Sequence, residues 1–140
     1  MKKMVWIAAG AALCLAVTEN AGPMVWGGRA PWLGLLASLL CIGALLGLPF
    51  LCRDSKRFLK AWQAVTGVLT VVAVVGLLKG NDVIASDAVV PLVALLTPFY
   101  GLTYAVPDAW FYPMFIVVSL VCCALCAFFI IRKESKEDTL

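Results

Sequence analysis

Long apolar runs alternate with short polar ones along this chain, and the apolar runs are long enough to cross a membrane. An α-helix needs about 20 largely apolar residues to span roughly 30 Å of hydrocarbon. Four runs meet this requirement, at residues 4–21, 32–52, 61–78 and 111–131. The stretches between them, GPMVWGGRAPW, RDSKRFLK and KGNDVIASD, are rich in turn-forming or charged residues. The pattern predicts an all-α integral membrane protein with a four-helix transmembrane bundle.

A fifth apolar stretch, residues 88–107, precedes the last span and allows two interpretations. It is uncharged, but Pro91, Pro98 and Gly101 interrupt it. It is either a re-entrant or outer-leaflet segment that returns to the side it entered from, or a kinked fifth transmembrane helix. Irregular backbone at membrane depth must be buried in protein or face water. A re-entrant segment therefore requires the other helices, or a second subunit, around it.

The distribution of basic residues favours the re-entrant interpretation. Cytoplasmic segments carry an excess of Lys and Arg. If residues 88–107 do not cross, nine of the 11 Lys and Arg residues lie on one side, and only Arg29 and Lys79 lie on the other. If they cross, the split becomes six against five. We predict four full spans, two cytoplasmic termini, and a disordered mixed-charge tail at 132–140.

Composition agrees with a lipid environment for one transmembrane domain over residues 1–140. The chain is 64% hydrophobic and 14% charged, against about 25% charged residues in soluble domains. Its net charge of +3 comes from short clusters between neutral runs, so we expect no nucleic-acid partner. The opening MKKMVW favours a bacterial cytoplasmic membrane, and the poor cleavage sites after residues 16 and 21 favour an uncleaved first span.

Small residues at four-residue spacing mark the helix faces that can pack closely in lipid. The first span offers Ala8, Ala12 and Ala16, the second offers the GxxxG pair Gly43 and Gly47, and the last offers Ser119, Cys123 and Ala127. Two interpretations stay open for these faces: packing within one bundle, and homo-oligomerisation through Gly43 and Gly47. Both can hold in the same protein.

The loop before the third span is the densest basic cluster. Arg53, Lys56, Arg57 and Lys60 follow the spacing i, i+3, i+4, i+7, so a helical extension places all four on one stripe. Anionic lipid headgroups are the natural partner of such a stripe at a membrane surface. The alternative is an anchor for topology with no specific lipid.

Six cysteines include a CxxC pair, Cys123 and Cys126, with the spacing of thiol redox pairs. A membrane thiol redox protein is therefore one alternative function. The pair lies inside a predicted span, however, where a thiol packs as a small apolar residue. Histidine is absent, and no catalytic or nucleotide-binding motif occurs. We expect no enzymatic activity, cofactor or metal site.

Two functional hypotheses remain after these exclusions. The first is association: an accessory or scaffolding subunit, or a homo-oligomer, that acts through its helix faces. The second is an oligomeric channel or an uncoupled small-solute transporter whose lining is the segment 95–104. Its candidate ligand-contacting or pore-lining residues are Arg29, Thr97, Tyr100 and Thr103. The last three have hydroxyl groups within the proline-interrupted stretch, and Arg29 is predicted to lie on the outer side of the membrane, where that stretch begins.

Overall fold

The computed structural model describes residues 2–137, and it is helical throughout apart from short connections. The elements in chain order are α1 (Lys2–Trp26), α2 (Trp32–Leu51), α3 (Lys56–Gly80), η1 (Asp87–Val89), α4 (Val90–Val93), η2 (Ala94–Tyr104) and α5 (Asp108–Glu137). The described residues contain no strand. Five helical stretches are long and apolar enough to cross a membrane, the fourth along the chain being Asp87–Tyr104. The all-α prediction is confirmed.

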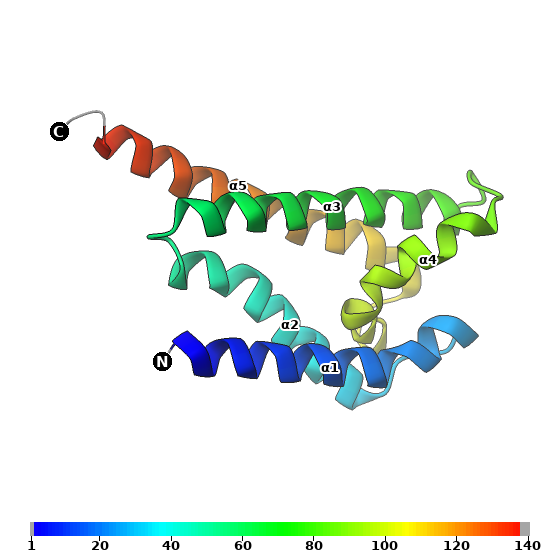
Figure 1. Cartoon of the computed structure of the whole chain (residues 1–140). Helices are drawn as coiled ribbons and strands as arrows, with labels where there is room; N and C mark the ends of the chain where they lie inside the picture. The colour runs from blue at the N-terminus through cyan, green and yellow to red at the C-terminus, as the bar shows by residue number, and fades with distance from the viewer. Residues whose placement is uncertain (1, 138–140) are drawn as a thin grey trace.

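The long helices form two pairs, α1 with α2 and α3 with α5 (Figure 1). One end of the bundle holds the start of α1, the turn between α2 and α3, and the end of α5 (Figure 1). Side chains link these parts: the rings of Trp6 and Phe58 are 5.7 Å apart, and the Lys133 ammonium donates to the Asp54 carbonyl. We call this end the basic end. Its basic residues are Lys2, Lys3, Arg53, Lys56, Arg57, Lys60, Arg132, Lys133 and Lys136.

The segment 87–104 begins at the opposite end of the bundle (Figure 1). An ion pair of 2.9 Å joins Asp87 to Lys79 near the end of α3. From there the chain runs inward as α4 and η2 between the two helix pairs (Figure 1). It then returns to the start of α5, where Tyr100 packs edge-on to Phe111 at 5.5 Å. Residues 96–103 are buried among the other helices, whereas most of residues 87–95 are exposed.

Proline and glycine explain why this segment is not one continuous α-helix. Pro91 stands in the first turn of α4, where no backbone N–H is needed. Pro98 falls inside η2, which runs for 11 residues, although 3₁₀ stretches longer than about four residues are uncommon. Tertiary contacts must therefore support the backbone of η2.

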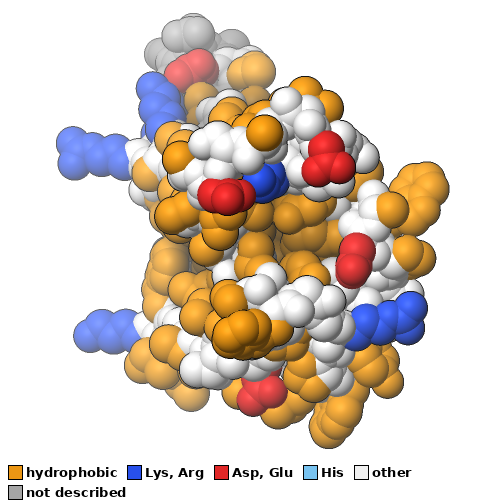
Figure 2. All heavy atoms as spheres, turned by 90° about the vertical axis from the view of Figure 1, so that its right-hand side faces the viewer, with side chains coloured by type: hydrophobic (Ala, Val, Ile, Leu, Met, Phe, Trp, Pro, Cys, Tyr) orange, Lys and Arg blue, Asp and Glu red, His pale blue; other side chains and the backbone are white. Residues whose placement is uncertain are grey.

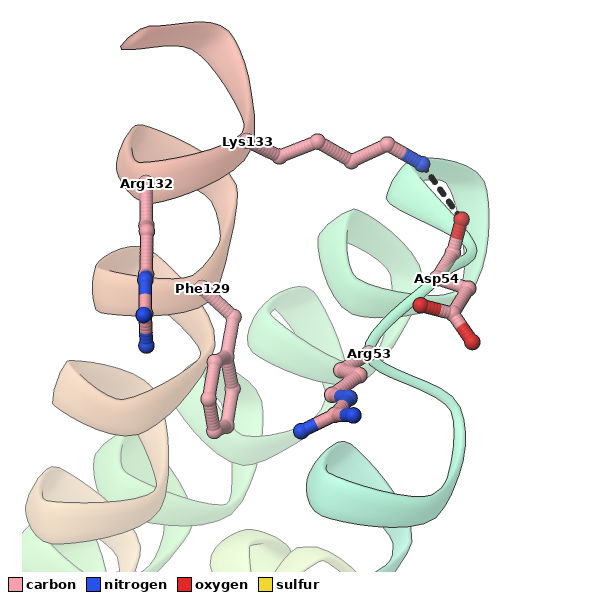
Figure 3. A pocket seen from close by; sticks show the side chains of 5 residues that line it. All are labelled: Arg53, Asp54, Phe129, Arg132 and Lys133. Carbon is pink, nitrogen blue, oxygen red and sulfur yellow. Dashed lines mark hydrogen bonds between the residues drawn. The ribbon is translucent and has the colours of Figure 1, made fainter. Parts of the chain in front are cut away.

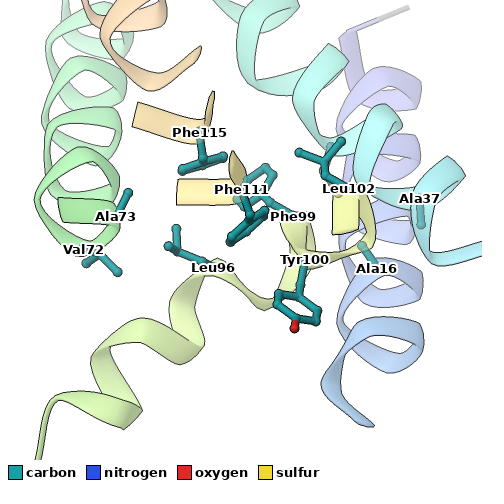
Figure 4. Close-up of a cluster of buried hydrophobic side chains, with 11 residues drawn as sticks. Ala16, Ala37, Val72, Ala73, Leu96, Phe99, Tyr100, Leu102, Phe111 and Phe115 are labelled. Carbon is teal, nitrogen blue, oxygen red and sulfur yellow. The ribbon is translucent and has the colours of Figure 1, made fainter. Parts of the chain in front are cut away.

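The main core forms where η2 meets the helices around it (Figure 4). Leu96 and Phe115 are fully buried, and the rings of Phe99 and Phe115 lie 4.5 Å apart. A second cluster lies nearer the basic end, between α2, α3 and α5. Its buried members are Leu45, Leu59, Cys122, Cys126 and Ile130. Aromatic side chains thus fill the space that the inward-running segment leaves between the helix pairs.

Three helices extend beyond the apolar runs that predicted them. α1 continues through Pro23 to Trp26, where Gly27, at φ 72°, and the bond from Gly28 N to Pro23 O end it. α3 begins at Lys56, because the Ser55 hydroxyl caps it by accepting from Phe58 N. α5 continues to Glu137, so the predicted disorder of the tail is wrong through that residue. Residues 138–140 lie outside the described part.

The opposite end has few charged side chains, and they stand among hydrophobic ones (Figure 2). The turns there hold Arg29 between α1 and α2, and Asp82 after α3. Asp82 has φ 58°, and the bond from Val83 N to Leu78 O closes the helix end around it. The strong excess of positive charge is therefore confined to the basic end.

Candidate functional site

A buried polar cluster holds the innermost turn of η2. The Ser38 hydroxyl on α2 donates to the Pro98 carbonyl at 2.7 Å and accepts from Gly101 N at 3.0 Å. The Asn20 amide on α1 donates to Ser38 at 3.0 Å and to Pro98 O at 3.4 Å. Asn20 and Ser38 are fully buried. They satisfy backbone groups that irregular structure leaves open at this depth.

Close backbone approach accompanies this cluster. A Cβ atom added to Gly101 would lie 2.0 Å from the Gly34 carbonyl oxygen, and one added to Gly34 would lie 2.3 Å from Asn20 Oδ1. Asn20 Oδ1 is buried without a hydrogen-bond partner, so it is packed against the Gly34 backbone rather than aimed at a cavity. Asn20 and Ser38 are not among the residues singled out from the sequence. Ser38 is a lone polar residue in an apolar run, whereas Asn20 follows Thr18 and Glu19 near the end of one.

Three of the four residues proposed to contact a ligand or line a pore, Thr97, Tyr100 and Thr103, are buried within this chain. The Thr97 hydroxyl bonds to Ala94 O and to Met24 Sδ, and the Thr103 hydroxyl bonds to Tyr100 O at 2.8 Å. Tyr100 is 9% exposed and packs in the core. Arg29 lies on the surface between α1 and α2. These threonines and Tyr100 stabilise the segment from inside, and the structure does not bring Arg29 together with them.

The small-residue faces divide into packed and open ones. Ala16 is fully buried and Ala12 is half-buried, whereas Ala8 is exposed near the start of α1. A Cβ added to Gly43 or Gly47 would meet nothing within 4 Å. Packing within this chain therefore accounts for the inner alanines of α1 but not for the GxxxG pair of α2.

The small residues of α5 pack against α3 through polar contacts. The Thr70 hydroxyl donates to the buried Ser119 hydroxyl at 2.8 Å, and Thr66 Oγ1 lies 2.9 Å from Cys123 Sγ. Ala127 follows on the same stripe and is half-buried. This stripe is therefore an intramolecular seam, as one of the two interpretations anticipated.

Pro49 leaves one backbone carbonyl of α2 without its helical donor, and two side chains donate to that carbonyl. Because proline has no N–H, the carbonyl of Leu45, four residues earlier in α2, lacks its helical partner. The Trp62 indole donates to this oxygen at 3.0 Å, and the Cys122 thiol donates to it at 3.1 Å. The missing helical bond thereby becomes a connection between α2, α3 and α5.

The structure separates the two cysteines of the CxxC pair. Cys126 is buried with Cys122 in the cluster nearer the basic end, whereas Cys123 is half-buried against α3 and donates to Gln63 O. All six cysteines are free. Each thiol of the pair has its own packing environment.

The predicted basic stripe is split by the helix boundary. Arg53 lies in the turn before α3, while Lys56, Arg57 and Lys60 lie in the first turns of the helix. Arg57 and Lys60 are exposed. The four charges share the basic end but do not form one helical stripe, because Ser55 begins the helix after Arg53.

An apolar pocket of about 430 Å³ lies between α1, α2 and α3, against the innermost part of the 87–104 segment. Trp6 and Trp62 line it toward the basic end, and Leu95 and Pro98 line it toward the middle. Its lining has no acidic or basic side chain. Its walls are almost wholly hydrocarbon, and the one ionisable group among them is the buried Cys41 thiol.

In the part of the chain that is described, no group of three or more His, Cys, Asp or Glu residues could hold a metal ion. The open surface that stands out is the outer face of α2, defined here as Leu36, Leu40, Gly43, Gly47 and Phe50. Its spacing alternates between four and three residues, the repeat of helices that pack against a partner helix. No protein-family model, curated protein or solved structure matches this chain.

Proposed function

We propose that this protein is a polytopic protein of a bacterial cytoplasmic membrane that acts by association and not by catalysis. The associating surface is the outer face of α2. It pairs either with a second copy of the chain or with another membrane protein, for which this chain is an accessory or scaffolding subunit. The mechanism is close helix packing, which positions partners in the bilayer without a chemical step.

The proposed topology has four full crossings, with 87–104 as a re-entrant segment and the basic end in the cytoplasm. Support comes from the course of the described chain. α1 starts and α5 stops at the basic end, and the segment that enters from the opposite end leads into an α5 that runs back to the basic end (Figure 1). The positive-inside bias favours the same orientation. The surrounding helices and the Ser38 bonds supply the protein environment that its irregular backbone needs.

One observation carries the association proposal: Gly43 and Gly47 have open space around them although both lie in the middle of a helix. Glycine is about 1 kcal/mol less favourable than alanine inside a helix, and nothing in the described part of this chain excludes a larger side chain there. Leu36 and Leu40, 47% and 61% exposed, continue the same face. Glycines between larger apolar residues let a partner helix approach closely in lipid.

Cysteine cross-linking in membranes tests this proposal. In a background with all native cysteines changed to alanine, Gly43→Cys should form a disulfide-linked dimer on mild oxidation if two copies pair through α2, because disulfides require Cα atoms within about 7 Å. Val68→Cys is the matched control, since Val68 is 56% exposed on α3. It should not cross-link.

Bulky substitutions test the same face without cysteine chemistry. Gly43→Leu with Gly47→Leu should reduce the associated fraction at least about tenfold, which corresponds to roughly 1.4 kcal/mol. If the chain instead pairs with another protein, Gly43→Cys should cross-link to that protein. A particle that stays monomeric and without a partner in mild detergent, whichever residue stands at 43 and 47, contradicts the proposal.

A further inference from the structure

A second, polar pocket lies at the basic end, where two segments far apart in sequence meet (Figure 3). Its volume is about 390 Å³. Arg53 and Asp54 contribute from the turn between α2 and α3, and Phe129, Arg132 and Lys133 contribute from the last turns of α5. The pocket exists only because the fold brings the end of α5 beside that turn.

The charges that line this pocket favour an anion. Three side chains are cationic, and the Asp54 carboxylate is the one acidic group among the five. Among the described residues, no ion pair or hydrogen bond engages the guanidinium of Arg53 or Arg132. The Lys133 ammonium donates to the backbone carbonyl of Asp54 and so ties the two walls together (Figure 3).

Arginine chemistry narrows the class of anion. A guanidinium presents a rigid fork of N–H donors that matches the oxygens of a phosphate or a carboxylate, and it is more weakly hydrated than an ammonium. Two such forks from opposite walls suit a phosphate, which has several acceptor oxygens directed to different sides. A monoanionic phosphodiester would lower the net charge of the lining from about +2 to about +1 and so is attracted to it.

The pocket also has apolar neighbours. The Phe129 ring lies between the two arginines (Figure 3) and packs edge-on to Phe50 at 5.1 Å. Close in sequence to Arg53 and Arg132, the side chains of Leu51 and Ile131 are 53% and 65% exposed. Cationic and exposed apolar side chains thus occur together at this end, as the headgroup and acyl chains of a phospholipid would require.

We infer that this pocket binds the phosphate of an anionic phospholipid of the phosphatidylglycerol type, with the acyl chains lying along Phe50, Leu51 and Ile131. The inference rests on the proposed membrane topology, which puts the basic end at the headgroups of the cytoplasmic leaflet. The site differs from the basic stripe predicted from sequence: it uses Arg53 together with Arg132 and Lys133, and it does not use Lys56, Arg57 or Lys60.

Lipid binding to the purified full-length protein tests the inference. In a non-ionic detergent, phosphatidylglycerol and phosphatidylcholine are added separately, and bound lipid is counted by native mass spectrometry. Phosphatidylglycerol should bind at least about tenfold more tightly, and the double variant Arg53→Gln, Arg132→Gln should lose most of that preference, since each charge contributes about 1 kcal/mol. The matched control Arg57→Gln, Lys60→Gln removes two exposed charges from the same end. It should change binding less than about twofold, because neither residue lines the pocket.

Two results would overturn the assignment. Equal loss in the control variant would mean that the charge of the whole end attracts the lipid and that the pocket does not. Inorganic phosphate or glycerol phosphate that binds with the same dependence on Arg53 and Arg132, while phosphatidylglycerol adds nothing, would assign the pocket to a soluble phosphate. The variants Arg53→Lys and Arg132→Lys keep the charge and remove the fork, so partial loss is expected even if the Gln variants fold poorly.

This test is independent of the association proposal. The Gly43→Leu, Gly47→Leu variant should bind phosphatidylglycerol with unchanged preference, because both glycines lie away from the pocket lining. Conversely, the Arg53→Gln, Arg132→Gln variant should keep the Gly43→Cys cross-link. With Arg53 and Arg132 unchanged, a Gly43→Cys cross-link without a preference for phosphatidylglycerol would mean that the lipid inference has failed. A preference for phosphatidylglycerol without any Gly43→Cys cross-link would mean that the association proposal has failed.

Discussion

Ser38 illustrates how one hydroxyl can stabilise irregular backbone inside an apolar bundle. This hydroxyl donates to Pro98 O and accepts from Gly101 N and Asn20 Nδ2. Pro98 and Gly101 are the residues that break the helix, so the groups that they expose are the groups that Ser38 binds. Its neighbour Gly34 leaves room for the turn to approach α2.

Replacing Ser38 by alanine should destabilise the protein by about 2 kcal/mol, because the buried Gly101 N–H loses its acceptor. Unfolding in mixed detergent micelles measures this change. Thr18→Ala is the control, since that hydroxyl is exposed and bonds only to carbonyls of its own helix. Its effect should stay within about 0.5 kcal/mol. Equal effects of the two substitutions would show that Ser38 does not support the turn.

Among the elements, prolines direct how the helices connect. Pro49 frees the Leu45 carbonyl, and Trp62 and Cys122 from two other helices bind it. The apolar runs predicted that α2 and α3 exist, because a run of about 20 apolar residues is a local property. They did not predict this connection, since a freed carbonyl can be satisfied by any donor that the fold brings near.

A double-mutant cycle tests the connection. Trp62→Phe should destabilise the protein by about 1 kcal/mol through loss of the indole N–H. In a Pro49→Ala background the effect should be smaller by at least about 0.5 kcal/mol, because the introduced alanine can donate its own backbone N–H to Leu45 O. Additive effects in detergent unfolding experiments would mean that Trp62 contributes by packing alone.

On the scale of the whole molecule, the inward-running segment decides how the chain is arranged in the proposed topology. Because this segment does not cross, α1, α2, α3 and α5 make four full crossings. The start of α5 then lies on the same side of the membrane as the α1–α2 turn. The basic end then collects the positive charge, and the charged residues of the opposite end stand among apolar ones (Figure 2).

Labelling with a membrane-impermeant maleimide tests this topology in a cysteine-free background. Arg29→Cys and Asp108→Cys should react in intact cells, whereas Glu134→Cys should react only after permeabilisation. The Asp108 and Glu134 positions are decisive, because a crossing segment would move Asp108 to the cytoplasmic side and Glu134 to the outside. Reaction of Glu134→Cys in intact cells would make the segment a fifth span.

The sequence by itself determined the helices, their apolar composition and the unequal distribution of charge along the chain. These properties depend on residue types within one stretch of chain, so length, composition and spacing are sufficient to predict them. The sequence also singled out Gly43 and Gly47, although it left open whether they pack inside the chain or face outward.

Only the tertiary structure decided which distant residues meet. It placed Asn20 and Ser38 against the turn at Pro98, left the GxxxG face of α2 open, and brought Arg132 and Lys133 beside Arg53. The contact at Pro98 and the basic pocket each join residues from different elements. The open face of α2 depends on where the other helices lie. Such proximity depends on how all the helices pack at once, and no local pattern carries that information.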